Sequence, residues 1–335
     1  MINPTYTPAS ERYDSGMKYR RCGKSGILLP EISLGLWHNF GDMNTFANSQ
    51  TMAHHAFDRG ITHFDLANNY GPSYGSAEET FGMIMKKSFM PYRDELFIST
   101  KAGHDMWPGP YGNWGSRKHL MSSLDQSLKR MNLEYVDIFY SHRYDPNTPI
   151  VETLQALVDI VRQGKALYVG ISKYPKDIAQ DAYYYLEEKG VHCLLYQGRY
   201  NIFNREPEEE GILRQAKENG TGFIAFSPLA QGLLTSRYLD GVPEDSRMAK
   251  EKFLKKEALT EGVLKKIKVL NEVAAQRGQT LAEMSLAWLL KDDLVTSVII
   301  GASSVAQIED NLKAMKNTNF SAEEVERIEM ICASL

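Results

Sequence analysis

Cysteine is scarce in this chain of 335 residues. Cys22, Cys193 and Cys332 lie far apart, and no Cys-x-x-Cys or Cys/His metal-ligand spacing occurs. This argues against a disulfide-stapled secreted fold and predicts a reduced, cytoplasmic protein without a metal. No apolar run approaches the ~18 residues of a membrane-spanning helix. Residues 1–19 also lack the basic and apolar regions of a secretory signal.

An excess of positive charge is also lacking. Lys and Arg together number 38, Asp and Glu 42, and the net charge is −4. We therefore expect no nucleic-acid partner and no membrane partner. An apolar fraction of 43% predicts a soluble protein with a sizeable core. No Pro/Ser/Gly-rich linker interrupts the chain, so residues 1–335 are predicted to form a single domain.

The glycine-rich turn that follows the first strand of a doubly wound sheet is missing too. One GxGxxA pattern, residues 220–225, precedes a strand, and we interpret it as chance. What the chain has is a regular alternation of apolar strand-like runs and helical patterns. The count of eight predicted strands favours a (β/α)8 barrel, the TIM barrel. The strands are predicted over residues 31–35, 61–64, 95–101, 135–140, 166–171, 192–197, 221–227 and 297–301.

Helices are predicted between these strands, with an N-terminal β-hairpin formed by residues 18–22 and 27–29. Thr148 and Pro149 are interpreted as the N-cap and first-turn proline of the fourth helix. Thr280 with Glu283, and the pair at 321 and 324, have the spacing of capping boxes, the second opening an extra C-terminal helix outside the barrel. The other helices are predicted at residues 50–58, 77–87, 117–131, 176–188, 208–219, 261–276 and 305–315, and residues 229–260 are predicted to be mostly a loop.

Chemically distinctive residues stand where strands end, and in a barrel this is where catalytic groups lie. Asp65 ends the second strand, and Tyr70 follows in a turn flanked by Asn and Gly. Lys101 ends the third strand, His142 follows the fourth, and Ser172 follows the fifth. Neighbouring strands would bring these side chains within reach of one another.

This set suits proton donation to a carbonyl oxygen. Tyr70 would be the donor, and the ammonium of Lys101 would lower the pKa of its phenol. Asp65 would hold Lys101, and His142 would hydrogen-bond and orient the substrate oxygen. No side chain can donate a hydride, so a cofactor must supply it.

Each residue also has a plainer interpretation: a helix cap, a packed turn tyrosine, a solvated lysine, a structural histidine. The conjunction of matched groups at neighbouring strand ends outweighs them. Two other barrel chemistries could use some of these residues. A Schiff-base aldolase could use Lys101 but needs no Asp65–Tyr70 pair. A metal-dependent hydrolase could use His63, Asp65 and His142, which strand alternation permits, but the first strand lacks an HxH motif.

The motifs around these residues resemble those of the aldo-keto reductases. They read FDLANNYG at 64–71, STK at 99–101, GIS at 170–172, FSPL at 226–229 and IGAS at 300–303. The resemblance runs from Gly23 to Asn311, nearly the whole chain. It implies that the catalytic tetrad is Asp65, Tyr70, Lys101 and His142, with NADPH/NADP+ lying across the barrel mouth.

The resemblance also implies the cofactor contacts, with Ser172 and Gln197 on the nicotinamide carboxamide and Phe226 stacked on the ring. Many members have a lysine and an arginine near the adenosine 2′-phosphate where this chain has Gly301 and Gln307. We nevertheless expect NADPH, with Arg237 compensating. The remaining implied contacts are Gly35, Trp37 and Asp65 beside the nicotinamide, Ser227, Leu229, Gly232 and Arg237 over the pyrophosphate, and Ser303, Gln307 and Asn311 at the adenosine end.

Segments 33–40, 105–111 and 115–118 are similar to a family branch of bacterial L-glyceraldehyde 3-phosphate reductases and potassium-channel β subunits. This implies NADPH-dependent reduction of small aldehydes with Tyr70 as general acid. The implied substrates are L-glyceraldehyde 3-phosphate, which would be reduced to glycerol 3-phosphate, and methylglyoxal. It implies a homo-oligomer as well. The alternative is a redox-sensing regulatory β subunit with low reductase activity.

Substrate contacts are expected from the residues near the barrel mouth. Packing of Trp107 and Trp114 against the barrel rim is an equally good interpretation of the loop after the third strand. A rim ion pair is an alternative for Arg143, and Arg117 and Arg199 are further candidates for binding a substrate phosphate. The expected substrate residues are Trp37, Tyr70, Trp107, His142 and Arg143.

Overall fold

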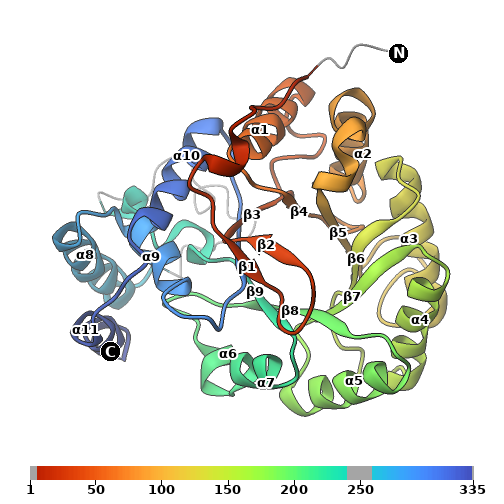
Figure 1. The fold of residues 1–335 in the computed structure, drawn as a ribbon. Helices are drawn as coiled ribbons and strands as arrows, with labels where there is room; N and C mark the ends of the chain where they lie inside the picture. The colour runs from red at the N-terminus through yellow and green to blue at the C-terminus, as the bar shows by residue number, and fades with distance from the viewer. Residues whose placement is uncertain (1–5, 240–258, 334–335) are drawn as a thin grey trace.

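The computed structural model describes residues 6–239 and 259–333. Within these ranges eight parallel strands close into a barrel surrounded by helices, which confirms the predicted TIM barrel (Figure 1). The strands, in the order in which they pair, are β10 (Ser297–Ile300), β3 (Ile32–Gly35), β4 (His63–Asp65), β5 (Phe97–Ala102), β6 (Val136–Ser141), β7 (Ala166–Ser172), β8 (Cys193–Arg199) and β9 (Gly222–Phe226).

The strands are apolar along most of their length because both of their faces are covered. Every residue of β5 and β6 is buried, as expected for parallel strands packed between a barrel interior and a layer of helices. The helices of that layer are α1 (Phe46–Asp58), α2 (Ser76–Ile84), α3 (Arg117–Met131), α4 (Ile150–Arg162), α5 (Lys176–Glu188), α6 (Glu206–Glu209), α7 (Ile212–Glu218), α8 (Glu261–Gln276), α9 (Leu281–Leu289) and α10 (Val305–Leu312).

Several helices begin and end where their sequence patterns predict. The bounds of α3, α5 and α8 match the predicted ranges, and the Thr280–Glu283 capping box at α9 forms. The extra C-terminal helix, α11 (Ala322–Ala333), begins with reciprocal hydrogen bonds between positions 321 and 324 and packs beside α8 (Figure 1). Of the loop predicted at 229–260, residues 240–258 lie outside the described residues.

Two helix predictions were wrong. The helix expected at 208–219 is divided into α6 and α7, because Gly211 between them has a φ of 78°, which no α-helix allows. Thr148 does not cap α4: its hydroxyl donates to Asp145 at 2.7 Å, and Pro149 is the N-cap. In both cases a non-helical turn is present where the sequence predicted part of a helix or its N-cap.

A hairpin closes the end of the barrel at which the strands begin. It pairs β1 (Tyr19–Arg21) with β2 (Leu28–Pro30) and lies across the ring of strands in Figure 1. Cys22 and Leu29 join an apolar cluster with residues from the barrel interior, including Leu195 and Ile224. Only the opposite end, where the strands finish, is left for a site. No helix among the described residues has the length and apolarity to cross a bilayer.

The contact between α2 and α3 leads to a stability prediction. A Cβ at Gly82 would lie 2.0 Å from the backbone oxygen of Arg130, whereas one at Gly262 in α8 would meet nothing closer than 3.8 Å. Gly82→Ala should therefore lower the free energy of unfolding by about 2 kcal/mol through overpacking. The matched Gly262→Ala should raise it by about 0.5 kcal/mol through the lost entropy of the unfolded chain. Urea titration measures both, and equal shifts would contradict the packing described here.

Candidate active site

The centre of the site is an ion pair between Asp65 and Lys101. In the pairing of β4 with β5, Asp65 lies opposite Ser99, and Lys101 is two residues further on the same face of β5. The Lys101 ammonium donates to Asp65 Oδ2 at 2.7 Å and to the backbone oxygen of Leu66 at 2.5 Å. Both side chains are buried. The other oxygen of Asp65 accepts from Ser99 at 2.7 Å and from Gln197 at 3.1 Å.

Tyr70 and His142 lie next to this pair. The Lys101 ammonium is 4.9 Å from the centre of the Tyr70 ring. The rings of Tyr70 and His142 meet edge to face at 6.0 Å. His142 reaches this point because it follows β6, whose Ser141 pairs with the last residue of β5. The structure thus brings together Asp65, Tyr70, Lys101 and His142, as the strand-end pattern predicts.

Burial sets the protonation of these groups. It raises the pKa of Tyr70 well above its ordinary value, and the charge of Asp65 adds to the rise. Burial likewise lowers the pKa of His142 well below its usual range, assisted by Lys101. The pKa of Lys101 is also lowered by burial, against the opposing pull of Asp65. The phenol of Tyr70 and the neutral imidazole of His142 are therefore the forms present near neutral pH. The pKa of Tyr70 is raised, although Lys101 was expected from the sequence to lower it.

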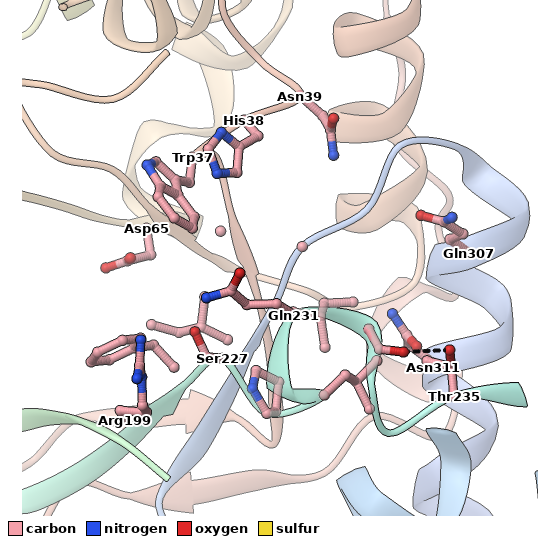
Figure 2. Close-up of a pocket in the computed structure, with 18 of the residues that line it drawn as sticks. Trp37, His38, Asn39, Asp65, Arg199, Ser227, Gln231, Thr235, Gln307 and Asn311 are labelled. Atoms are coloured by element: carbon pink, nitrogen blue, oxygen red, sulfur yellow. Dashed lines mark hydrogen bonds between the residues drawn. The ribbon is translucent and has the colours of Figure 1, made fainter. Parts of the chain in front are cut away.

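A cavity of about 680 Å³ opens above this centre. Figure 2 shows Trp37 and Asp65 on one side of it and Gln307 and Asn311, on α10, on another. Residues predicted from the resemblance line it together with Tyr70 and His142: Gly35, Trp37, Asp65, Gln197, Phe226, Ser227, Leu229, Gly232, Arg237, Gln307 and Asn311.

Two predicted cofactor residues and Lys101 are not in the cavity wall. Ser172 is buried and pairs with Gln197, a wall residue, across β7 and β8, and its hydroxyl has no hydrogen-bond partner among residues 6–239 and 259–333. Ser303, before α10, donates to Gln307 from its backbone nitrogen at 2.8 Å. An unpartnered buried hydroxyl beside Gln197 is what a polar ligand group at this depth would require.

Two predicted substrate residues, Trp107 and Arg143, are absent from the described lining of the cavity. The ring of Trp107 packs 5.0 Å from that of His119. The Arg143 guanidinium donates to the backbone oxygen of Gly103 and to the side chain of Asn113, each at 2.8 Å. Arg143 therefore holds the loop after β5, and Arg117 is paired with Asp159 on α4.

Sequence reasoning missed several residues of the wall, among them Lys173 and His104. The Lys173 ammonium lies 3.4 Å from His104 Nε2, and the His104 ring contacts that of His142 at 4.5 Å. Burial and the neighbouring Lys101, Arg143 and Arg199 lower the pKa of Lys173 to about 8. Its place directly after Ser172, at the end of β7, was the signal available in the sequence.

Comparison with known proteins identifies the family. The model of the Aldo/keto reductase family matches residues 31–333. This chain is an aldo/keto reductase. It is 57% identical over 323 residues to an L-glyceraldehyde 3-phosphate reductase of Escherichia coli (strain K12), covering 95% of this chain and 93% of the relative. It is 35% identical over 305 residues to a probable voltage-gated potassium channel subunit beta of Arabidopsis thaliana, covering 89% of this chain and 91% of that relative.

The buried pair of this aldo/keto reductase leads to a second stability prediction. Asp65→Asn leaves the Lys101 ammonium buried without its counter-charge and should cost about 3 kcal/mol of unfolding free energy. The double variant Asp65→Asn/Lys101→Met should recover part of that loss, because no buried charge remains. Asp293→Asn is the control, since it breaks an exposed pair with Lys217 and should cost less than about 1 kcal/mol. Denaturant unfolding would refute the prediction if the double variant were less stable than Asp65→Asn.

Proposed function

We propose that this aldo/keto reductase uses NADPH to reduce small aldehydes to alcohols, with L-glyceraldehyde 3-phosphate converted to glycerol 3-phosphate as its main reaction. The proposal rests on the buried Asp65–Lys101 pair and on Tyr70 and His142 beside it, which line a cavity that extends to α10. The identity of 57% to an L-glyceraldehyde 3-phosphate reductase supports this substrate. Methylglyoxal is proposed as a second, unphosphorylated substrate.

In this proposal Tyr70 is the general acid. Its raised pKa keeps the phenol protonated, and the alkoxide that forms on the substrate is a stronger base than a phenolate, so the proton moves downhill. The Lys101 ammonium stabilises the phenolate that remains, and Asp65 holds Lys101 in place. His142, neutral because of burial, orients the substrate oxygen beside Tyr70.

The cofactor residues are proposed on the fit between the cavity and a nicotinamide dinucleotide. The unpartnered hydroxyl of Ser172 and the amide of Gln197 offer a donor and an acceptor for the carboxamide. Phe226 offers an apolar face to the ring, and Gln307 and Asn311 would hold the adenosine end. Bound there, NADPH supplies the hydride.

The preference for NADPH over NADH is assigned to Arg237. The cavity wall at the α10 end contains Gly301 and Gln307, which carry no charge. Asp310 also lines this end, but Lys313 is paired with it at 2.7 Å. Arg237, another wall residue, is the cation proposed to bind the 2′-phosphate.

A substrate phosphate is proposed to bind at Lys173 and Arg199. Both line the cavity, and neither is paired with a carboxylate among the described residues. Lys173 has a φ of 55°, a conformation that costs energy for a side chain other than glycine and that is often kept at functional sites. Arg199 was one of the candidates from the sequence, whereas Arg143, another of them, already donates to Gly103 and Asn113.

The regulatory β subunit is the second candidate, on the 35% identity to a probable channel subunit. It predicts very slow turnover and dependence on a membrane partner, so rapid reduction by the isolated protein decides for the enzyme. The single-domain organisation, the cytoplasmic location and the homo-oligomer remain predictions.

Tyr70→Phe tests the general acid. Loss of the phenolic proton should lower kcat for aldehyde reduction by roughly 10²–10⁴-fold, the usual worth of a positioned acid. NADPH binding, followed by quenching of protein fluorescence, should be retained. Tyr74→Phe, on the exposed part of the same turn, is the matched control and should turn over like the unmodified enzyme. Wild-type kcat in Tyr70→Phe would show that the acid is misassigned.

The phosphate site is tested by comparing kcat/KM for L-glyceraldehyde 3-phosphate with that for glyceraldehyde and methylglyoxal. The phosphorylated aldehyde should be preferred, and Lys173→Met should raise its KM about tenfold, the worth of one charge-assisted hydrogen bond. Because the pKa of Lys173 is about 8, this KM should also rise as the pH passes 8 and the ammonium loses its proton. An equal loss for all three aldehydes would refute a phosphate contact at Lys173.

A further inference from the structure

The barrel interior beneath the ion pair contains a continuous chain of polar side chains. Ser297 Oγ lies 2.6 Å from Ser33 Oγ, which lies 2.9 Å from His63 Nδ1. On the other side of the ring, His63 Nε2 lies 3.1 Å from Ser99 Oγ, which donates to Asp65 at 2.7 Å. All five residues are buried, and they come from the adjacent strands β10, β3, β4 and β5.

In this series of side chains, one set of hydrogen-bond directions gives every group a donor or acceptor role that it can fill. The Asp65 carboxylate fixes that direction. An ionised Asp65 can only accept, so Ser99 gives it its single proton. Ser99 must then accept from His63, which places the imidazole proton on Nε2. The bare Nδ1 in turn accepts from Ser33, and Ser33 accepts from Ser297. Every proton therefore points towards Asp65.

His63 is neutral in this arrangement. Burial lowers the pKa of His63 to about 4, with Asp65 opposing the shift and Lys101 adding to it. A neutral imidazole has one N–H, and the contacts on its two sides differ in role, so a single tautomer is selected. Both ring nitrogens are occupied by serines, which leaves neither for the metal site considered from the sequence.

We propose that His63 is a positioning residue of the reductase centre. By donating from Nε2, it fixes the Ser99 hydroxyl on Asp65 Oδ1, and the carboxylate so oriented presents Oδ2 to Lys101 beside Tyr70. His63 is not among the described residues that line the cavity, and its ring nitrogens contact Ser33 and Ser99, so it acts through Ser99 and Asp65. Its effect on turnover rests on the proposed function, but the tautomer does not.

The tautomer is measured by long-range ¹⁵N–¹H correlation NMR of the protein labelled with ¹⁵N-histidine, the His63 signal being assigned by its loss in His63→Gln. Neutral, Nε2-protonated His63 is expected at pH 7. A ring protonated on Nδ1, or on both nitrogens, overturns the proposal. In Asp65→Asn, Lys101 should keep the amide oxygen and leave the NH₂ group facing Ser99 and Gln197, whose own amide then turns its oxygen towards it. Ser99 would then accept from this NH₂ group and donate to His63 Nε2, which moves the imidazole proton to Nδ1. An unchanged tautomer there also overturns it.

Turnover gives the second measurement. His63→Leu should lower kcat for aldehyde reduction about tenfold, which corresponds to a rise of about 1.4 kcal/mol in the activation free energy. The KM and the NADPH dissociation constant should not change. His63→Gln, whose amide can still donate to Ser99, should restore most of it. The double variant His63→Leu/Ser99→Ala should be no slower than Ser99→Ala alone, because both act through one hydrogen bond.

The positioning role would be refuted if the double variant lost kcat by the product of the two single-variant factors, or if His63→Leu kept the wild-type kcat. Ser285→Ala, which removes another buried serine hydroxyl that bonds only within α9 and not to the polar chain, controls for general loosening of the structure. If the His63 variants unfold, Ser33→Ala tests the same chain from its far side and should lower kcat while sparing KM. A wild-type protein that binds NADPH yet reduces no aldehyde would instead contradict the proposed function and leave the tautomer test standing.

Discussion

The buried ion pair between Asp65 and Lys101 is the constraint on which the site depends. Removing two charges from water costs several kcal/mol per ion, and this cost is offset only when geometry and further hydrogen bonds are good. Here the carboxylate accepts from Ser99 and Gln197, and the ammonium also donates to the Leu66 carbonyl. Four hydrogen bonds therefore hold the pair in a fixed orientation. Without Asp65 the Lys101 ammonium beside Tyr70 would not remain charged at this depth.

The barrel provides this pair through strand register. Parallel pairing sets Asp65 on β4 opposite Ser99, two residues before Lys101 on β5, and sets Lys101 opposite Tyr140, two residues before His142. The hairpin β1–β2 covers the other end, so the polar ends of the strands open in one direction only. Burial then determines which groups hold protons: it keeps Tyr70 protonated and His142 neutral. The water-excluding barrel interior that packs the strands therefore also sets the protonation states of the site.

Much of the fold was predictable because periodicity and capping are local signals. The apolar strand runs, the stripes of α3 and α8 and the Thr280–Glu283 capping box were all identified from the sequence. Predictions were wrong where a turn competed with a helix, at Gly211 and at Thr148. The membership of Asp65, Tyr70, Lys101 and His142 in one centre followed from their strand-end positions and from motif resemblance. Arg143 was a reasonable phosphate candidate by position, yet tertiary contacts engage its guanidinium elsewhere.

By itself the sequence determined the (β/α)8 architecture and the chemical groups at the barrel mouth, because strand pattern and residue type are written directly along the chain. The tertiary structure alone decided which cations face the cavity, the direction of the Tyr70 pKa shift and the polar chain through His63. Each of these depends on side chains from several strands meeting in space and on how much water they exclude. Neither distance nor burial can be read from one strand at a time.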